Sequence, residues 1–97
     1  MSRINFLTMI HETVTSLAPA EVLSRAKEFF AERVPLQAAF PEKEGPGFLT
    51  LRGQGGEELS LVVIPGTGSS RIRASTLFFD QPLARFLSTL PPGSEAA

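Results

Sequence analysis

The sequence predicts a single α+β domain, in which an antiparallel sheet of about five strands packs with one long and one short helix. Several runs rich in β-branched and aromatic residues follow one another along the chain, separated by Gly- and Pro-rich turns. Two segments carry apolar residues at helical spacing, one before these runs and one after them. The 97 residues, of which 42% are hydrophobic, suffice for one core and are too few for two.

Residues 4–15 are predicted to form the first strand. They are rich in β-branched and aromatic side chains, and Ile4, Phe6 and Ile10 share one parity of a period of two. A helix remains the alternative, because Ile4, Leu7 and Ile10 also fit a helical spacing.

A long helix is predicted to begin within residues 16–21 and to run to about residue 34. Pro19 is tolerated in a first helical turn, and Glu21 suits the positive end of the helix dipole. Glu21 and Arg25 stand at i and i+4 on the solvated face. Pro35 is expected to end the helix. The apolar stripe contains Val22, Ala26, Phe29 and Phe30.

The middle of the chain predicts an antiparallel meander. Residues 36–40 form a short strand, and the prolines and glycines of residues 41–47 indicate a loop. Strands are then expected at residues 48–52, 57–64 and 71–79, joined by turns at residues 53–56 and 65–70.

The second helix is predicted at residues 80–90. Asp80 is a good N-cap residue, and Pro82 falls in the first turn. The apolar residues Leu83, Phe86 and Leu90 lie on one helical face. Residues 91–93 end the helix, so that we expect one domain at residues 1–92 and a tail at residues 93–97.

The order of strand, proline-initiated helix, meander and closing helix resembles a truncated form of the helix-grip superfamily of START domains and polyketide cyclases (SRPBCC). Residues 12–23, ETVTSLAPAEVL, are similar to the opening of that superfamily, where a strand gives way to a helix. The resemblance implies a closing helix that lies across a curved sheet, with an apolar ligand held between them. It implies no particular functional residue in this chain.

The predicted register divides the meander into two faces. Pairing Arg52 with Glu57 and Ile64 with Arg71 across the two turns places residues such as Phe48, Leu59 and Phe78 on the face that receives the helices. The opposite face is unusually apolar for a solvated sheet face. Its candidate interaction residues are Leu49, Leu51, Val62, Ile64, Arg71, Arg73, Leu77 and Phe79. The alternative is that a helix, or residues 4–15 in helical form, covers this face within the chain.

Composition excludes most catalytic constellations. The chain has no Cys, Tyr or Trp, which removes thiol chemistry and Cys-ligated zinc, and it has one His. Nine basic against ten acidic residues provide no net field for nucleic acid. No apolar run approaches the length of a membrane span, and the N-terminus lacks a signal-peptide pattern, so a cytoplasmic location is expected.

Several residues suggest chemistry, and each has a simpler explanation. The Gly-rich segments 53–56 and 66–70 lack the following helix of a phosphate-binding loop and are interpreted as hairpin turns. Arg71 and Arg73 suit a carboxylate or phosphate, although cross-strand pairing with a residue such as Glu58 is commoner. His11 has no orienting partner near it in sequence, and Asp80 is better explained as a cap.

The sequence therefore favours a non-catalytic binding or accessory subunit without a cofactor or metal. It is expected to dock onto a larger protein assembly, which includes the case of a membrane-bound partner, or to self-associate through its sheet. The alternative is a carrier of a small apolar ligand held between the sheet and the closing helix. An enzyme would require at least two of His11, Asp80, Arg71 and Arg73 to converge in one cleft.

Overall fold

The computed structural model describes residues 9–32, 38–77 and 79–93. Expectations for residues 4–8, 33–37, 78 and 94–97 lie outside these residues, and they include the start of the first predicted strand, the end of the first helix and the placement of Phe78. The elements that the structure describes are β1 (Met9–Thr15), α1 (Pro19–Glu32), β2 (Ala39–Gly45), β3 (Phe48–Gly53), β4 (Glu58–Pro65), β5 (Ser70–Thr76) and α2 (Asp80–Ser88).

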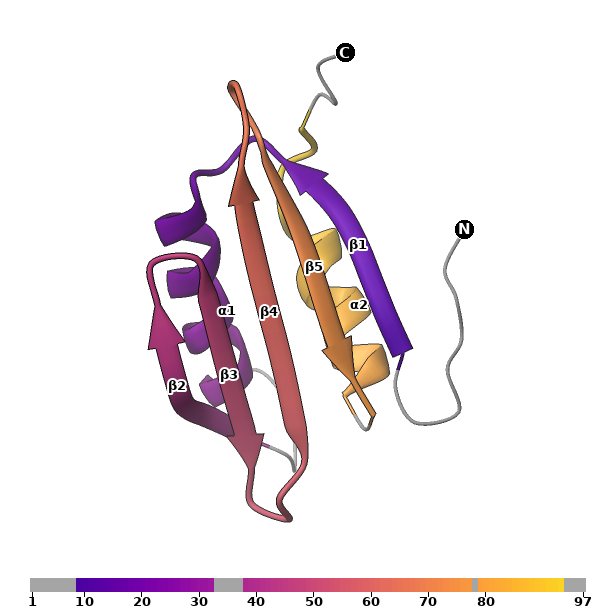
Figure 1. Ribbon diagram of the computed structural model, residues 1–97. Coiled ribbons are helices and arrows are strands. Elements are labelled where there is room, and N and C mark those ends of the chain that lie inside the picture. The colour runs from indigo at the N-terminus through magenta and orange to yellow at the C-terminus, as the bar shows by residue number, and fades with distance from the viewer. Residues whose placement is uncertain (1–8, 33–37, 78, 94–97) are drawn as a thin grey trace.

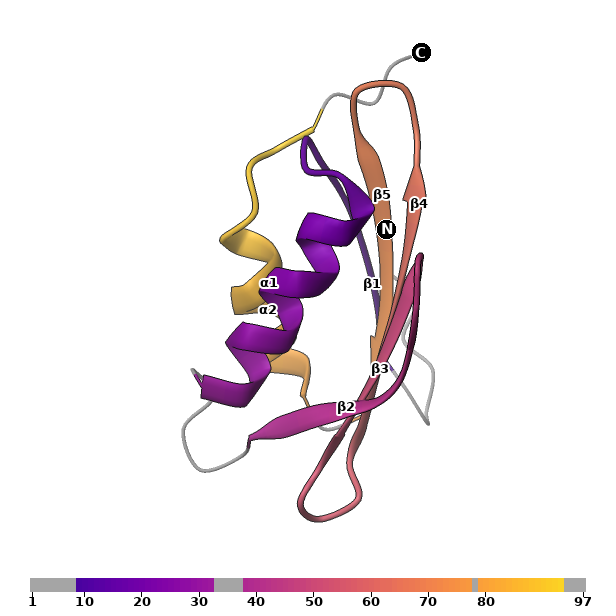
Figure 2. The same ribbon diagram turned by 90° about the vertical axis from the view of Figure 1, so that its left-hand side faces the viewer.

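The strands form one antiparallel sheet in the order β1-β5-β4-β3-β2, and both helices pack on the same face of it (Figures 1 and 2). This two-layer arrangement confirms the predicted α+β class with a sheet of five strands. Strand β1 pairs with β5 along its whole length, which confirms the strand interpretation for residues 9–15. We call the helix-covered side of the sheet the inner face and the opposite side the outer face.

The core fills the space between the inner face and the two helices. Helix α1 buries Val22, Ala26 and Phe30, as its apolar stripe predicts. The Phe30 ring lies 6.1 Å from the Phe79 ring and 5.9 Å from the Phe86 ring, measured between centroids. Tilted and edge-to-face contacts of this kind are the favoured geometry for aromatic pairs. One aromatic cluster thus joins α1 to α2 and to the segment that leads into α2.

The expected loop at residues 41–47 is wrong for most of its length. Strand β2 continues to Gly45, with an irregular register between Pro41 and Lys43, and the turn to β3 takes only Pro46 and Gly47. Proline and charged residues suggested a loop, yet both are tolerated on an edge strand, where one side of the backbone has no partner strand. The same features hinder pairing of β2 with a further strand.

Five residues lie between the cross-strand partners at the β3–β4 turn, one more than the sequence suggested. Arg52 pairs with Glu58 instead of Glu57, because the Gly53 N–H donates to the Glu57 carbonyl and Glu57 belongs to the turn. Gly56, at φ 89°, supplies the left-handed conformation that this turn requires. A shift of one residue moves every side chain of a strand to the other face. The second hairpin pairs Ile64 with Arg71, as predicted.

The chain after α2 returns to the edge of β1. Thr15 donates its hydroxyl proton to the Pro91 carbonyl at 2.6 Å, and the Gly93 N–H donates to the Val14 carbonyl at 3.0 Å. A Cβ at residue 93 would lie 2.6 Å from the Thr15 carbonyl carbon, so that only glycine fits this approach. Gly93, which the sequence assigns to a tail, is therefore bonded to the sheet.

Candidate interaction surface

The outer face of the sheet is the most distinctive surface among the described residues. Neither α1 nor α2 lies on it, and Figure 1 looks directly onto it. Alternation along the strands, fixed by the cross-strand register, assigns its residues. On the four strands from β1 to β3 they are Ile10, Glu12 and Val14 of β1; Arg71, Arg73 and Ser75 of β5; Glu58, Ser60, Val62 and Ile64 of β4; and Phe48, Thr50 and Arg52 of β3.

Five of the eight predicted interaction residues are exposed. Val62 and Ile64 lie on the outer face of β4, Arg71 and Arg73 lie beside them on β5, and Leu77 follows the end of β5. The apolar residues among them expose 44%, 51% and 48% of their surface, in the order Val62, Ile64 and Leu77. These values are high for large apolar side chains on a small domain.

The assignment of Leu49, Leu51 and Phe79 to the outer face is wrong, since all three are buried in the core. Because the β3–β4 register is shifted by one residue, the side chains of Leu49 and Leu51 point to the inner face. Phe79 lies beyond the end of β5, where strand alternation no longer applies, and its ring packs against Phe30. The same register change moves Phe48, predicted on the inner face, to the outer face, where it is 42% exposed.

Phe48, Val62 and Ile64 form an exposed group that we call the apolar triad. Phe48 is the cross-strand neighbour of Val62, and Ile64 follows two residues later on the same side of β4. The Phe48 ring lies over Gly45, where a Cβ would clash with it. Glycine at this position of β2 allows the ring to lie against the sheet. The triad therefore spans the middle of the outer face, since β4 is the central strand.

Charged residues of the outer face pair with each other. Arg73 Nε lies 4.0 Å from Glu12 Oε2 on β1. Arg52 donates from Nε and Nη2 to both carboxylate oxygens of Glu42, and it lies 3.5 Å from Glu58. The hydrogen bond between Arg52 and Glu42 lowers the pKa of the Glu42 carboxyl. The same bond raises the pKa of the Arg52 guanidinium. The expected pairing of Glu58 with Arg71 or Arg73 is replaced here by pairing with Arg52.

His11 and Asp80 are brought together on the other side of the sheet. His11 Nε2 lies 2.7 Å from Asp80 Oδ1, joining β1 to the first turn of α2. The interpretation of Asp80 as an N-cap is wrong, because Phe79 is the N-cap residue and Asp80 is the first residue of the helix. His11 is the cross-strand neighbour of inner-face Ala74, whereas Arg73 points outward. The histidine pair and the arginines therefore lie on opposite faces.

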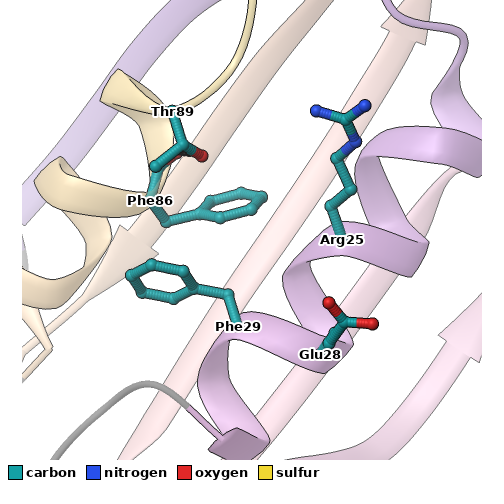
Figure 3. A pocket seen from close by; sticks show the side chains of 5 residues that line it. All are labelled: Arg25, Glu28, Phe29, Phe86 and Thr89. Carbon is teal, nitrogen blue, oxygen red and sulfur yellow. Dashed lines mark hydrogen bonds between the residues drawn. The ribbon is translucent and has the colours of Figure 1, made fainter.

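Grooves on the helical side are shallow and open. One, of about 250 Å³, lies between α1 and α2. Figure 3 shows the rings of Phe29 and Phe86 pointing toward each other between the two helices, with Arg25 and Glu28 on α1 beside them. The ring centroids of Phe29 and Phe86 are 5.4 Å apart. Arg25 is engaged by Glu21 at 2.9 Å, so the groove presents no uncommitted cation to an anionic ligand.

The Gly-rich segment forms a hairpin turn, as expected, with the turn at residues 66–69 and Ser70 already in β5. The Gly66 N–H donates to the Ser69 carbonyl at 2.7 Å, and Gly68 takes a left-handed φ of 72°.

Within the described part of the chain, no helix has the length and apolar character needed to cross a bilayer. No protein-family model, curated protein or solved structure matches the chain. The resemblance to the helix-grip superfamily therefore stays a prediction.

Proposed function

We propose that this protein is a non-catalytic binding module that docks onto another protein through the outer face of its sheet. The apolar triad carries the proposal. An antiparallel sheet with one solvated face ordinarily alternates apolar residues inside with polar residues outside. Here three large apolar side chains share the outer face, and Leu77, which directly follows β5, is a further exposed apolar residue.

Energetics indicate that docking must use the whole face. Fully burying one large apolar side chain contributes about 1.5–3 kcal/mol, so four half-exposed side chains supply about 4 kcal/mol. Association itself costs roughly 4–15 kcal/mol. The triad and Leu77 therefore need further contacts from the surrounding polar residues, such as Ser60, Thr50 and Arg73, to form a stable complex.

The positions of the candidate catalytic residues support a binding role. A nucleophile or base acts only within hydrogen-bond reach of the same substrate atoms as its partners. His11 and Asp80 meet on the helical side, while Arg71 and Arg73 belong to the outer face. Neither His11 nor Asp80 lines the grooves at the helix pair, the β1 edge or the β2–β3 turn.

The contacts in the core favour docking over transport of an apolar ligand. A carrier of the helix-grip kind would hold its ligand between the sheet and the closing helix. In that layer the Phe30 ring already contacts the rings of Phe79 and Phe86, and all three rings are buried. Docking through the outer face leaves this packing intact. We retain the cytoplasmic location as part of the proposal.

The test replaces Val62 and Leu77 together by Lys in the full chain. Complex formation is measured by co-purification from the native cell and by sedimentation of the purified protein. We expect the double variant to lose the complex while its circular dichroism spectrum stays unchanged, because both side chains are exposed in the isolated domain. Ala84→Lys, at an exposed position on α2, is the matched control and should retain the complex.

Two results would overturn the proposed function. The first is a complex that survives in the folded double variant, which would place docking elsewhere on the molecule. The second is a wild-type chain that forms no complex in either assay.

A further inference from the structure

We infer that the partner on the outer face is a second copy of this chain, related by a two-fold axis that passes close to Val62. The inference rests on the proposed function, since it names the occupant of the same surface. It predicts a dimer in which two sheets stack face to face between outer layers of helices. Stacked sheets of this kind pack about 10 Å apart, with their strands roughly 30° from aligned.

The position of the apolar triad favours an isologous contact. In a two-fold dimer each residue near the axis meets its own copy or a close neighbour. Val62 is on the central strand, between Phe48 on one side and Arg73 on the other. An axis that passes over Val62 sets Val62 against its own copy and brings the two triads close to each other. An axis displaced toward β5 and β1 would set these side chains against Arg71, Arg73 and Glu12.

The charges of the outer face favour a copy of itself over a strongly charged partner. Arg73 is beside Glu12, and Arg52 is held by Glu42 and Glu58. Pairs formed within one chain leave little charge to attract a polyanion or a strongly acidic or basic protein. The same pairing means that two copies approach without a large like-charge repulsion. The outer face thus combines an apolar centre with charged residues that pair within the same chain, and such a surface is complementary to a copy of itself.

The size of the outer face suits a small dimer. A sheet of five strands, each about seven residues long, has a flat face of roughly 550 Å² at the usual strand spacing and rise. Side chains that stand out from the sheet increase this area. Stable interfaces bury about 800 Å² on each partner, so the whole face is needed and is close to sufficient. An axis near the centre of the face provides the largest overlap.

The absence of cysteine from the chain allows a site-specific test. Val62→Cys places a single thiol near the proposed axis, and Ala84→Cys places one on the helical side as the control. Stacked sheets hold opposed backbones farther apart than a disulfide can bridge, so the probe is a bifunctional maleimide that spans about 10 Å. We expect covalent dimer at least about tenfold faster from Val62→Cys than from Ala84→Cys at equal concentration.

Sedimentation equilibrium of the cysteine-free chain completes the test. We expect a monomer–dimer equilibrium whose dissociation constant rises about 100-fold or more in Val62→Lys, because the two-fold axis would bury two like charges together. Ala84→Lys should leave the constant unchanged. Circular dichroism of each variant confirms that the monomer remains folded.

Each other outcome has a distinct meaning. A monomeric wild type, or a dimer that crosslinks equally well from both cysteine positions, would overturn the second copy as the occupant. If that monomer still binds a different protein, and if Val62→Lys with Leu77→Lys abolishes the binding, the proposed function stands and only the partner changes. A monomer that binds nothing through this face would overturn both.

Discussion

A single hydrogen bond between His11 and Asp80 connects two residues that are 69 positions apart. No local pattern links them, since His11 belongs to a strand and Asp80 resembles a cap. The bond forms because the first turn of α2 is placed over the edge strand β1, and an acidic residue in that turn also suits the helix dipole. Its place in the fold indicates a tie between the sheet edge and the closing helix.

Removing this tie should cost a modest amount of stability. We expect His11→Ala to lower the free energy of unfolding by about 1 kcal/mol, because the two side chains are partly exposed and the bond is screened by water. Urea denaturation of wild type, His11→Ala, Asp80→Ala and the double variant measures the change in the free energy of unfolding and the coupling between the two residues. Strict additivity of the two single changes would show that the residues do not interact.

Strand β2 is the element that the local sequence does not reveal, because most of its residues have the composition of a loop. Its Pro41, its irregular register and its charged residues are features of a protected edge, and Arg52 of β3 anchors it through both carboxylate oxygens of Glu42. The charges that suggested a solvated loop are therefore part of the strand's attachment. Edge strands and charged loops share a composition, and the two differ in whether a neighbouring strand is present.

The Glu42–Arg52 pair should make the stability depend on acid pH. Hydrogen bonding from Arg52 lowers the pKa of the Glu42 carboxyl in the folded chain. A lowered folded-state pKa stabilises the protein above the ordinary carboxyl pKa, and the contribution is lost as the pH falls through the lowered value. We expect Glu42→Gln to flatten the pH dependence of the melting temperature in the acid range. Glu32→Gln, an exposed carboxylate on α1, is the control, and equal flattening in both variants would contradict the assignment.

One aromatic cluster in the core joins the two helices to each other and to the segment between β5 and α2. Phe30 of α1 contacts Phe79 before α2 and Phe86 within α2, and all three rings are buried. The cluster unites segments from both halves of the chain. A domain of this size has a total stability of only about 5–15 kcal/mol, so that a single buried ring represents a large part of it.

Truncating the central ring should come close to unfolding the protein. We expect Phe30→Ala to destabilise the fold by about 3–5 kcal/mol, from lost burial and from the cavity it leaves. Phe30→Leu, which retains most of the volume, should cost clearly less. Thermal denaturation followed by circular dichroism compares them. A loss below about 1 kcal/mol for Phe30→Ala would mean that the ring is not central to the core.

The faces of the sheet could be assigned from the sequence only in part. Alternation correctly placed Val62, Ile64 and Arg73 on the outer face, because the β4–β5 register followed from a turn of the expected length. It failed at Leu49 and Leu51, because Glu57 belongs to the β3–β4 turn and one extra turn residue inverts a strand. Phe79, beyond the end of β5, is buried as well, so that half of the six predicted apolar residues belong to the core, and Phe48 is exposed on the outer face although it was predicted on the inner one.

Local chemistry fixed the kind of fold. Periodicity, turn residues and helix-start signals act over a few neighbouring residues, and they sufficed to predict the antiparallel meander and the order of its helices. The register of β3, the pairing of Glu42 with Arg52 and the meeting of His11 with Asp80 depend on how elements pack, which involves residues far apart in the chain. The outer face belongs to this second group, since a surface exists only once the layers that leave it uncovered have assembled.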